Sequence, residues 1–326
     1  PSWGQNRLRG MLESRPDWCI SRQRSWGLPI PAFKSGDTIL LTQHSTQHIA
    51  SIFDADGSDA WFKQSAQELL SDYDPSQDPD CPTSFDKHNA EKLYDIFDVW
   101  FESGSSWHAV MQTHHGNQPI DLYLEGSDQH RGWFHLSLLA CLGVHQRAPY
   151  KQLLTHGFIV DKEGRKMSKS MGNTLDVSDI LKQYGAEVTR WWVSSLNYEN
   201  DIKVDMSFFD AASETYRKIR NTIRFLLSNL SGYTLLSQDA IQTDFQNLFP
   251  KHSIESYVLG KLFEYEQAIR NAYQGFQFKQ ANQLVYECCT ELLSSFYCAI
   301  TKDTLYCDAP QSAKRYRIQV AYQLII

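Results

Sequence analysis

The sequence of 326 residues lacks the features that mark several classes of protein. It has no apolar run of about 18 residues and no recognisable signal peptide, so we expect no membrane segment. Its seven cysteines include no Cys-x-x-Cys pair and no Cys/His spacing typical of a zinc site. We therefore predict reduced thiols, no metal site and a cytoplasmic location.

The chain also lacks an excess of basic charge, since its formal net charge is −7. Any contact with a nucleic acid must therefore come from local patches and not from a general basic field. No Ser-His-Asp or Cys-His arrangement indicates a nucleophilic enzyme. Hydrophobic residues make up 42% of the chain, which is enough for a core and, at this length, for two or three domains.

The order of apolar runs predicts an α/β fold in the first half of the chain. Residues 121–143 read as a strand, a turn and a helix, because the apolar residues after the turn recur at helical spacing. Residues 151–160 read as the next strand. This order predicts a parallel sheet, whose ligands bind beyond the carboxyl ends of the strands. We also expect a short helix at 59–71 followed by an irregular loop, and a buried strand at 98–110 that runs into a turn at Gly104.

The second half of the chain reads as helical. One helix is predicted to begin near Asp176 or Ser178, since either residue can serve as its N-cap. Further helices are expected at 207–231, 254–274 and 278–300. On the first of these, residues at three- to four-residue spacing form an apolar stripe, namely Tyr216, Ile219, Ile223, Leu226, Leu227 and Leu230.

The most informative string is HGFIVDKEGRKMSKSMGN at 156–173. Lys166 and Lys169 stand three residues apart, with Ser168 and Ser170 beside them and glycines on both sides. This composition predicts a flexible cationic loop that can fold over a polyphosphate. An isolated pair of lysines would more often be a solvated surface, so the prediction depends on the whole string.

A second string, YLEGSDQHRGWF at 123–134, places Glu125 and Asp128 at a turn from strand to helix. Carboxylates at such a turn can hold an ammonium group or ribose hydroxyls, and Gly126 allows a ligand to approach the backbone. The start of the helix adds partial positive charge. The alternative is a plain N-capping turn, with Ser127 or Asp128 as the cap and Glu125 merely solvated.

Two further strings complete the pattern, DWCISRQRSWGLPIP at 17–31 and DVWFESG at 98–104. The four motifs in this order resemble the class I aminoacyl-tRNA synthetases, and the strings at 98–104 and 123–134 resemble the isoleucine type of that family. The resemblance covers nearly the whole chain. It implies an α/β architecture, with the second half of a Rossmann-like catalytic domain at 1–150, the KMSKS loop and stem-contact region at 151–205, and a truncated all-α anticodon-binding bundle at 206–326.

The resemblance implies an enzyme that joins an amino acid to tRNA. The amino-acid carboxylate would attack the α-phosphorus of ATP, giving an aminoacyl-adenylate and pyrophosphate, and the aminoacyl group would then pass to tRNA. Lys166 and Lys169 would stabilise the developing negative charge, with Lys169 in direct contact with ATP. The implied ATP-binding residues are Lys169, Ser168, Ser170, His156, Gly157 and Phe158. The implied adenylate-binding residues are Glu125, Gly126, Asp128 and Gln129, with Trp100 and Trp133 as walls of the amino-acid pocket.

The implied substrates and partners are isoleucine, ATP with Mg²⁺ and tRNA(Ile), without a zinc site in this stretch and with a monomeric parent enzyme. Arg217, Arg220 and Arg224 follow one another at i, i+3 and i+7 on the helix predicted at 207–231. Such a basic stripe can contact the tRNA backbone. It can equally be a solvated helix face, with Glu214 as the nearest carboxylate.

Several parts of such an enzyme are not found in the sequence. They are the His-x-Gly-His string of the first half-sheet, the editing domain and a C-terminal zinc region. We therefore expect a fragment that is inactive in adenylation on its own. Two alternatives stay open, a valine- or leucine-type member of the family and a non-catalytic tRNA-binding module descended from a synthetase. A His-x-Gly-His string upstream in the natural gene product would discriminate between an enzyme and such a module.

Overall fold

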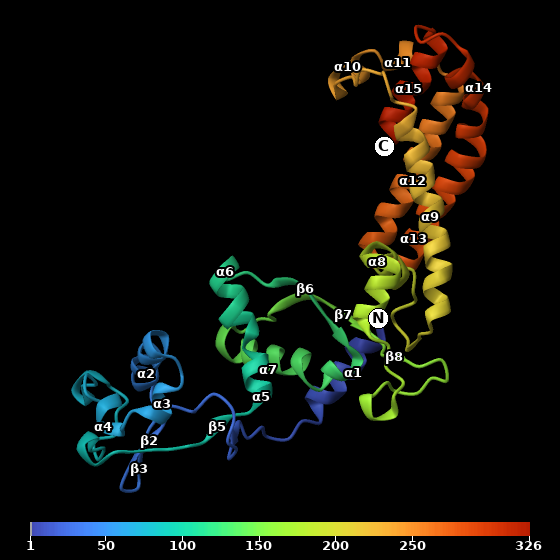
Figure 1. Ribbon diagram of the computed structural model, residues 1–326. Coiled ribbons are helices and arrows are strands. Elements are labelled where there is room, and N and C mark those ends of the chain that lie inside the picture. The colour runs from blue at the N-terminus through green and yellow to red at the C-terminus, as the bar shows by residue number, and fades with distance from the viewer. Residues whose placement is uncertain (1) are drawn as a thin grey trace. The chain divides into compact units, whose positions relative to one another are not determined.

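A computed structural model describes residues 2–326, without the side chains of Ser2 and Lys169. The chain forms two compact units, Pro1–His156 and Gly157–Ile326. In Figure 1 the first unit runs from blue to green and the second from yellow-green to red. The N-terminal helix is α1 (Ser2–Glu13).

Within the first unit, residues 32–93 build a small apolar core of their own. Phe33 and Trp61 are fully buried and meet edge to face at 5.0 Å, and Leu40, Ile49 and Leu69 are buried around them. The sheet is antiparallel with the order β3-β2-β4. Its elements are β2 (Phe33–Ser35), β3 (Thr38–Leu40) and β4 (Glu91–Lys92), with the helices α2 (Gln43–Asp56), α3 (Ala60–Lys63) and α4 (Ala66–Leu69).

The prediction of a single helix at 59–71 is wrong, because the chain forms the two short helices α3 and α4 there. Ser65 separates them by acting as an N-cap. Its hydroxyl accepts a hydrogen bond from the Glu68 amide, and the Glu68 carboxylate accepts one from the Ser65 amide. The expected irregular stretch follows, with only the two 3₁₀ turns η1 (Pro75–Gln77) and η2 (Lys87–Asn89).

The prediction of a strand at 98–110 is also wrong. The chain is helical there, as α5 (Val99–Gly104) and the π-helix η3 (Trp107–Gln112), followed by α6 (Thr113–His115). Asp98 starts this helix, since its Oδ1 accepts a hydrogen bond of 3.0 Å from the Trp100 amide. The apolar and aromatic composition favours a strand, but the cap outweighs that preference.

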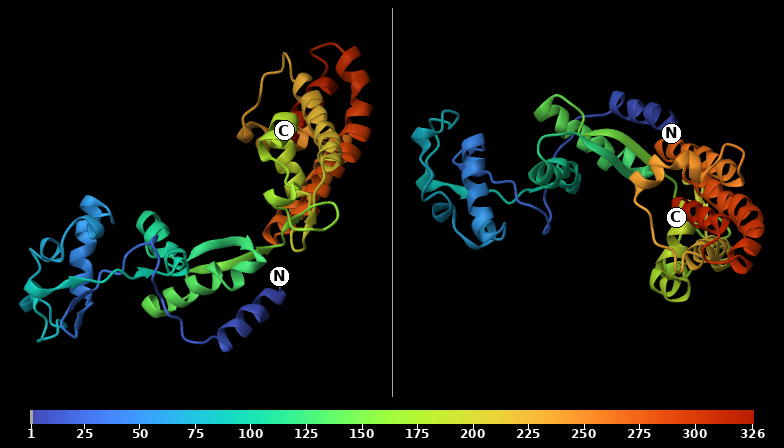
Figure 2. Two further views of the ribbon diagram at one scale, coloured as in Figure 1. Left: turned by 60° about the horizontal axis from the view of Figure 1, so that its bottom comes forward. Right: turned by 90° about the horizontal axis from the view of Figure 1, so that it is seen from above.

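The strand–helix–strand unit predicted from residue 121 onward is confirmed (Figure 2). It consists of β6 (Ile120–Gly126), the 3₁₀ turn η4 (Ser127–His130), α7 (Trp133–His145) and β7 (Tyr150–His156). The two strands are parallel, with Glu125 opposite Thr155 and Gly126 opposite His156. Both strands therefore end at the same edge of the sheet, where ligands of α/β folds bind. A short antiparallel ribbon, β1 (Ser21–Arg22) with β5 (Ile96–Phe97), precedes this unit.

The second unit begins with a short parallel pair, β8 (Ile159–Val160) and β9 (Ile202–Lys203). The strand predicted at 151–160 is therefore broken between β7 and β8. Between β8 and β9 lie the cationic string, with the 3₁₀ turn η5 (Lys169–Met171), and helix α8 (Val177–Ser194). The predicted start of α8 is confirmed, because the Asp176 carboxylate accepts a hydrogen bond of 2.7 Å from the Ser178 amide.

The three helices predicted beyond residue 206 are confirmed as α9 (Met206–Ser228), α12 (Ile254–Gln274) and α13 (Phe278–Glu287). The last continues without a break as the π-helix η6 (Cys288–Cys298) and α14 (Ala299–Cys307). Tyr297 and Tyr322 are fully buried in the core of this helical region. Three helices were not predicted, α10 (Gln238–Thr243), α11 (Phe245–Leu248) and α15 (Ala313–Ile325).

Candidate active site

The end of the β6–β7 pair brings together two of the predicted site residues. Glu125 is the last residue but one of β6 and His156 is the last residue of β7, and Glu125 Oε1 lies 3.8 Å from His156 Nε2. Both side chains are partly exposed. Glu125 Oε1 also accepts a hydrogen bond of 2.9 Å from the Gly126 amide. This strand end thus offers a solvent-accessible carboxylate and an imidazole to an ammonium or hydroxyl group.

The turn after β6 is organised by Gln129. Its Oε1 accepts a hydrogen bond of 3.0 Å from the Trp133 amide, and its Nε2 donates one of 3.1 Å to Asp128 Oδ2. Gln129 therefore supplies the acceptor at the start of α7. Neither Ser127 nor Asp128 caps a helix, so the plain capping turn considered for this string is not formed. The Asp128 carboxylate is exposed.

The two tryptophans expected to wall one pocket have different surroundings. Trp133 stacks on Tyr123 at 4.1 Å, and its Nε1 donates a hydrogen bond of 3.0 Å to Ser106 Oγ. Trp100 is 43% exposed on α5. It lines a pocket of about 390 Å³ together with Arg22, Trp26, Glu102 and neighbouring residues.

The strings at 17–31 and 98–104 meet at the buried carboxylate of Asp98. Asp98 is 7% exposed, and its Oδ2 accepts hydrogen bonds from Arg22 Nη2 and from Trp18 Nε1. Burial opposes the charged form, but the hydrogen bonds from Trp100 and Trp18 hold the pKa of Asp98 below its usual value. A second link joins the Leu28 amide to Glu102 Oε1 at 2.8 Å. Two motifs that are far apart in sequence thus form one structure.

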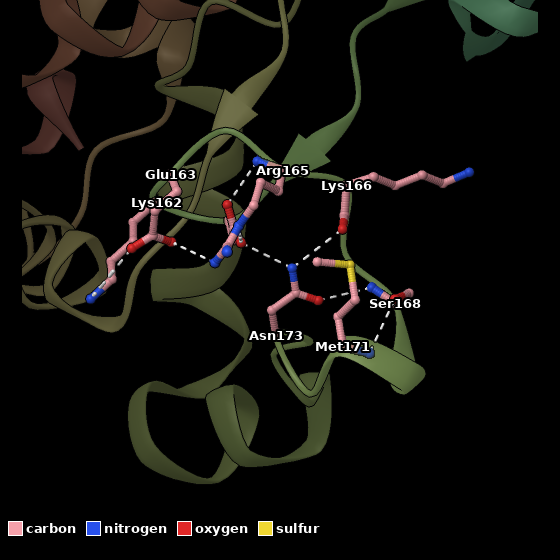
Figure 3. Close-up of polar contacts among 8 residues, drawn as sticks. Lys162, Glu163, Arg165, Lys166, Ser168, Met171 and Asn173 are labelled. Atoms are coloured by element: carbon pink, nitrogen blue, oxygen red, sulfur yellow. Dashed lines mark hydrogen bonds and ion pairs between the residues drawn. The ribbon is translucent and has the colours of Figure 1, made fainter.

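The cationic loop of the second unit is built on a turn that begins at Asp161. Figure 3 shows polar contacts of this loop. The Gly164 amide donates a hydrogen bond of 2.8 Å to the Asp161 carbonyl, and the Asp161 amide donates one of 2.9 Å to the Arg165 carbonyl. Gly164 has a φ of +85°, a conformation that side chains rarely adopt. Beyond the turn, Lys166 forms a β-bridge with Val160. Backbone hydrogen bonds and the β-bridge therefore order the chain as far as Lys166, the first lysine of the KMSKS string.

The carboxylate of Asp161 is the polar centre of the loop. It is 5% exposed. Its Oδ1 accepts a hydrogen bond of 2.7 Å from the Arg165 amide, and its Oδ2 accepts bonds of 2.9 Å from both Arg165 Nε and Asn173 Nδ2. The Asn173 amide and the Arg165 donors hold the pKa of Asp161 at about 2.

Asn173 joins the far end of the loop to its middle. Besides its bond to Asp161, Nδ2 donates to the Lys166 carbonyl at 3.2 Å, and Oδ1 accepts from the Ser168 amide at 2.9 Å. One amide side chain therefore contacts three points of the loop, as the dashed lines in Figure 3 show. The loop is closed on itself from residue 161 to residue 173.

The structure separates the cations of this loop into two kinds. Arg165 pairs with Asp161 and, at 3.2 Å, with Glu163, and Lys162 lies 4.0 Å from the same Glu163. Lys166 is exposed, makes no ion pair within the described residues, and extends away from the hydrogen-bond network in Figure 3. The backbone of Lys169 belongs to η5, while its side chain lies outside the described residues.

The two serines of the string have different neighbours in the loop. Ser168 Oγ accepts a hydrogen bond of 3.3 Å from the Met171 amide and lies 3.1 Å from Ser170 Oγ. Ser168 is partly buried, whereas Ser170 is exposed. Ser168 therefore stabilises the η5 turn, and Ser170 keeps an accessible hydroxyl.

Gly157 and Phe158 pack against the segment that leads into β9. The Gly157 amide donates a hydrogen bond of 2.8 Å to the Tyr198 carbonyl, and the Phe158 amide donates one of 2.9 Å to Asp201 Oδ1. A Cβ atom on residue 157 would lie 2.3 Å from the backbone carbonyl of Asn200. Glycine is thus required here by close packing. The Phe158 ring is exposed.

The predicted stripe on α9 is only partly buried. Ile219 and Leu226 lie in the core, whereas Ile223 and Leu227 are 42% and 51% exposed. Of the three arginines, Arg217 pairs with Glu214 at 2.6 Å. The other two, Arg220 and Arg224, line a shallow groove together with Ile223 and Leu227.

Asp161, Arg165 and Asn173 were not among the predicted site residues. A signal for the turn is present in the sequence, because Asp-x-x-Gly at 161–164 carries favoured residues at the first and last positions of a β-turn. No local pattern indicates that Asn173 reaches back to Asp161, twelve residues away.

Two further properties bear on function. Among residues 2–326, no helix combines the length and apolar character needed to cross a membrane. Within the same described residues, no group of three or more His, Cys, Asp or Glu side chains is arranged to hold a metal ion.

The chain matches two family models. Residues 1–205 match the tRNA synthetases class I (I, L, M and V), and residues 255–326 match the anticodon-binding domain of tRNA ligase. Among curated proteins, the isoleucine--tRNA ligase of Thermotoga petrophila is 42% identical over 330 residues, covering 100% of this chain and 35% of that protein. The isoleucine--tRNA ligase of Campylobacter curvus is 43% identical over 330 residues, covering 100% and 34%. The chain thus spans about a third of the length of these relatives.

Two solved structures share the fold at 16% sequence identity. The LeuRS of Agrobacterium radiobacter K84, in a ternary complex with tRNA and LeuAMS, has a TM-score of 0.67 over 98% of this chain and 40% of that chain. The methionyl-tRNA synthetase of Mycobacterium tuberculosis, in complex with methionyl-adenylate, has a TM-score of 0.51 over 100% and 52%. The predicted fold class, an α/β catalytic part followed by a helical anticodon-binding part, is confirmed. Because the first family model covers well over half of its residues, the chain belongs to the class I tRNA synthetases of the I, L, M and V group.

Proposed function

We propose that this chain is part of an isoleucine--tRNA ligase. The parent protein activates isoleucine with ATP, bound with Mg²⁺ as the substrate, and transfers the isoleucyl group to tRNA(Ile). The observation that carries the proposal is the identity of about 42% along the whole chain with isoleucine--tRNA ligases. Valine- and leucine-type readings lack such support from the relatives named above.

The proposal divides the chain into three parts by role. Residues 1–150 belong to the catalytic domain, residues 151–205 carry the KMSKS loop and the region that contacts the tRNA stem, and residues 206–326 belong to the anticodon-binding bundle. The parent enzyme is monomeric and cytoplasmic. This chain supplies one part of the ATP site, so adenylation requires the rest of the parent protein.

In this proposal the loop provides positive charge to the triphosphate of ATP. The attack of the isoleucine carboxylate on the α-phosphorus leaves negative charge on the phosphoryl oxygens and on pyrophosphate. Lys166 suits this role because it is exposed and has no carboxylate partner among the described residues, unlike Arg165 and Lys162. Lys169, three residues further on, contacts ATP directly, and Ser168 and Ser170 support the turn that carries it.

The strand end of the first unit binds the adenylate in this proposal. The exposed carboxylate of Glu125 holds the α-ammonium or a ribose hydroxyl, and His156 beside it contacts the adenosine part together with Gly157 and Phe158. Gly126, Asp128 and Gln129 line the same turn. Trp100, exposed at the pocket on α5, and Trp133 form walls for the isoleucine side chain. Arg217, Arg220 and Arg224 are assigned to the tRNA backbone, with Arg217 the weakest candidate because Glu214 neutralises it.

The proposal is tested by Lys169→Ala in the full-length protein that contains this chain. Removal of one preorganised charged donor should cost about 2–4 kcal/mol of transition-state stabilisation, roughly a 30- to 1000-fold loss in isoleucine-dependent pyrophosphate exchange. Lys182→Ala is the matched control, because Lys182 is an exposed lysine of the same unit that lies 3.7 Å from Asp179. An unchanged exchange rate for Lys169→Ala refutes the role of the loop, and activation of valine or leucine in preference to isoleucine refutes the substrate.

A further inference from the structure

We infer that Asn173 is a positioning residue, whose amide, anchored on Asp161, fixes the backbone from which the KMSKS loop presents its lysines to ATP. The inference rests on the proposed function. It arises from the contacts of one side chain that binds a carboxylate, a carbonyl and an amide at three separate points of the loop.

Asp161 is the anchor of the loop. Asp161 is almost completely buried and follows β8 directly, and its amide and side chain bind Arg165 on the other side of the turn. The Val160–Lys166 bridge joins this turn to the β8–β9 pair. Asp161 is therefore a point of the second unit against which the remainder of the loop can be fixed.

The amide of Asn173 holds the loop backbone at two points. Asn173 Nδ2 binds the carbonyl of Lys166, and Oδ1 binds the amide of Ser168, so the backbone on both sides of Met167 is set by this side chain. Met167 itself packs on the apolar cluster of α8 and α9. The Lys166 side chain extends from this fixed segment into solvent (Figure 3). Asn173 thus positions the backbone from which the Lys166 side chain extends, and its own role is not ligand binding.

The contacts at position 173 favour asparagine. Three contacts require both a donor and an acceptor on one short, neutral side chain. Aspartate would keep the acceptor for the Ser168 amide but would place a second carboxylate 2.9 Å from that of Asp161. An exchange of the two residues, Asp161→Asn with Asn173→Asp, would restore a donor and an acceptor at that contact.

The test uses the full-length protein with Asn173→Asp, Asn173→Ala and the double exchange. Asn247→Ala is the matched control, because Asn247 makes an exposed hydrogen bond of 2.6 Å to Asp244 in the same unit. We expect Asn173→Asp to raise the KM for ATP in pyrophosphate exchange about tenfold or more, to leave the KM for isoleucine within about twofold, and to be partly rescued by the double exchange. A loss of folded protein alone would lower kcat and leave both KM values unchanged.

A second readout is independent of activity. Trypsin cleaves after the lysines and arginine of residues 162–169, so release of the loop should accelerate cleavage there in the Asn173 variants and not in Asn247→Ala. Unchanged cleavage in Asn173→Asp overturns the anchoring, and faster cleavage with an unaltered KM for ATP overturns the positioning role. If the unmodified protein does not exchange pyrophosphate with isoleucine, the proposed function fails, and the positioning role fails with it even where the cleavage rates show that the loop is anchored.

Discussion

The replacement Gly157→Ala tests whether this glycine serves packing, as the structure indicates. A Cβ atom at this position would lie 2.3 Å from both the carbonyl carbon and oxygen of Asn200 and 2.5 Å from the Asp201 amide nitrogen. These distances are about 1 Å inside the 3.4 Å at which ordinary contact begins. Because the neighbours are backbone atoms, no side-chain rotation can relieve the overlap.

The segment at 198–201 must therefore move away from residue 157. Three hydrogen bonds depend on its place, from the Gly157 amide to Tyr198, from the Phe158 amide to Asp201 and from the Ile202 amide to Phe158. Overpacking of this kind costs about 1–3 kcal/mol, and the partial weakening of these three hydrogen bonds together adds about 1 kcal/mol. We expect a total loss of about 3 kcal/mol in the free energy of unfolding.

Urea unfolding of the chain, followed by far-UV circular dichroism, measures this loss. With a slope of about 2 kcal/mol per molar, the midpoint of the second unit should fall by about 1.5 M. Gly260→Ala is the control, because this exposed glycine lies within α12 and has no atom within 4 Å of a built Cβ. The Gly260→Ala variant should have a free energy of unfolding that is about 0.5–1 kcal/mol higher than that of the unmodified chain. A Gly157→Ala midpoint indistinguishable from that of the unmodified chain would refute the packing argument.

Three further results are expected. Asp98→Ala should destabilise the first unit by about 2 kcal/mol and Asp98→Asn by less, since asparagine keeps the cap of α5; equal urea midpoints would contradict this. Neutralising Arg220 and Arg224 should reduce the salt dependence of tRNA binding by the full-length protein. An unchanged slope of the logarithm of the binding constant against the logarithm of salt concentration would show that these arginines do not contact tRNA. Asn173→Ala should raise the pKa of Asp161 toward its usual value, as followed by the NMR titration of its carboxyl carbon.

The sequence predicted those elements that depend on short-range patterns. The unit from β6 to β7 alternates a strand, a polar turn and a helical period within about forty residues, and each signal is local. The helices α9, α12 and α13 were predicted for the same reason. The N-cap of α8 is likewise a local signal, because Asp176 binds an amide only two residues away.

The failures occur where one polar contact outweighs composition. Residues 98–110 have the aromatic and β-branched content of a strand, yet one hydrogen bond that Asp98 accepts from the Trp100 amide begins a helix. In the candidate site the motif identified the cationic string, but not the way in which Asp161 and Glu163 pair with Arg165 and leave Lys166 without a carboxylate. Which cation pairs with a carboxylate depends on the direction that the turn gives to each side chain. The spacing of residues along the sequence does not determine this direction.

The pH dependence of the loop follows from the low pKa of Asp161. A carboxyl group whose pKa is lower in the folded chain stabilises that state fully above its unfolded pKa, and the contribution is lost as the pH falls through the folded value. For Asp161 the usual value is 3.8 and the folded value about 2, so the contacts of Arg165 and Asn173 should persist down to about pH 4 and be lost toward pH 2. Trypsin is inactive in that pH range. The release of the loop can be followed there by the rate of cleavage with an acid-active protease such as pepsin. Release of the loop between pH 7 and pH 5 would show that another group, and not this carboxylate, holds it.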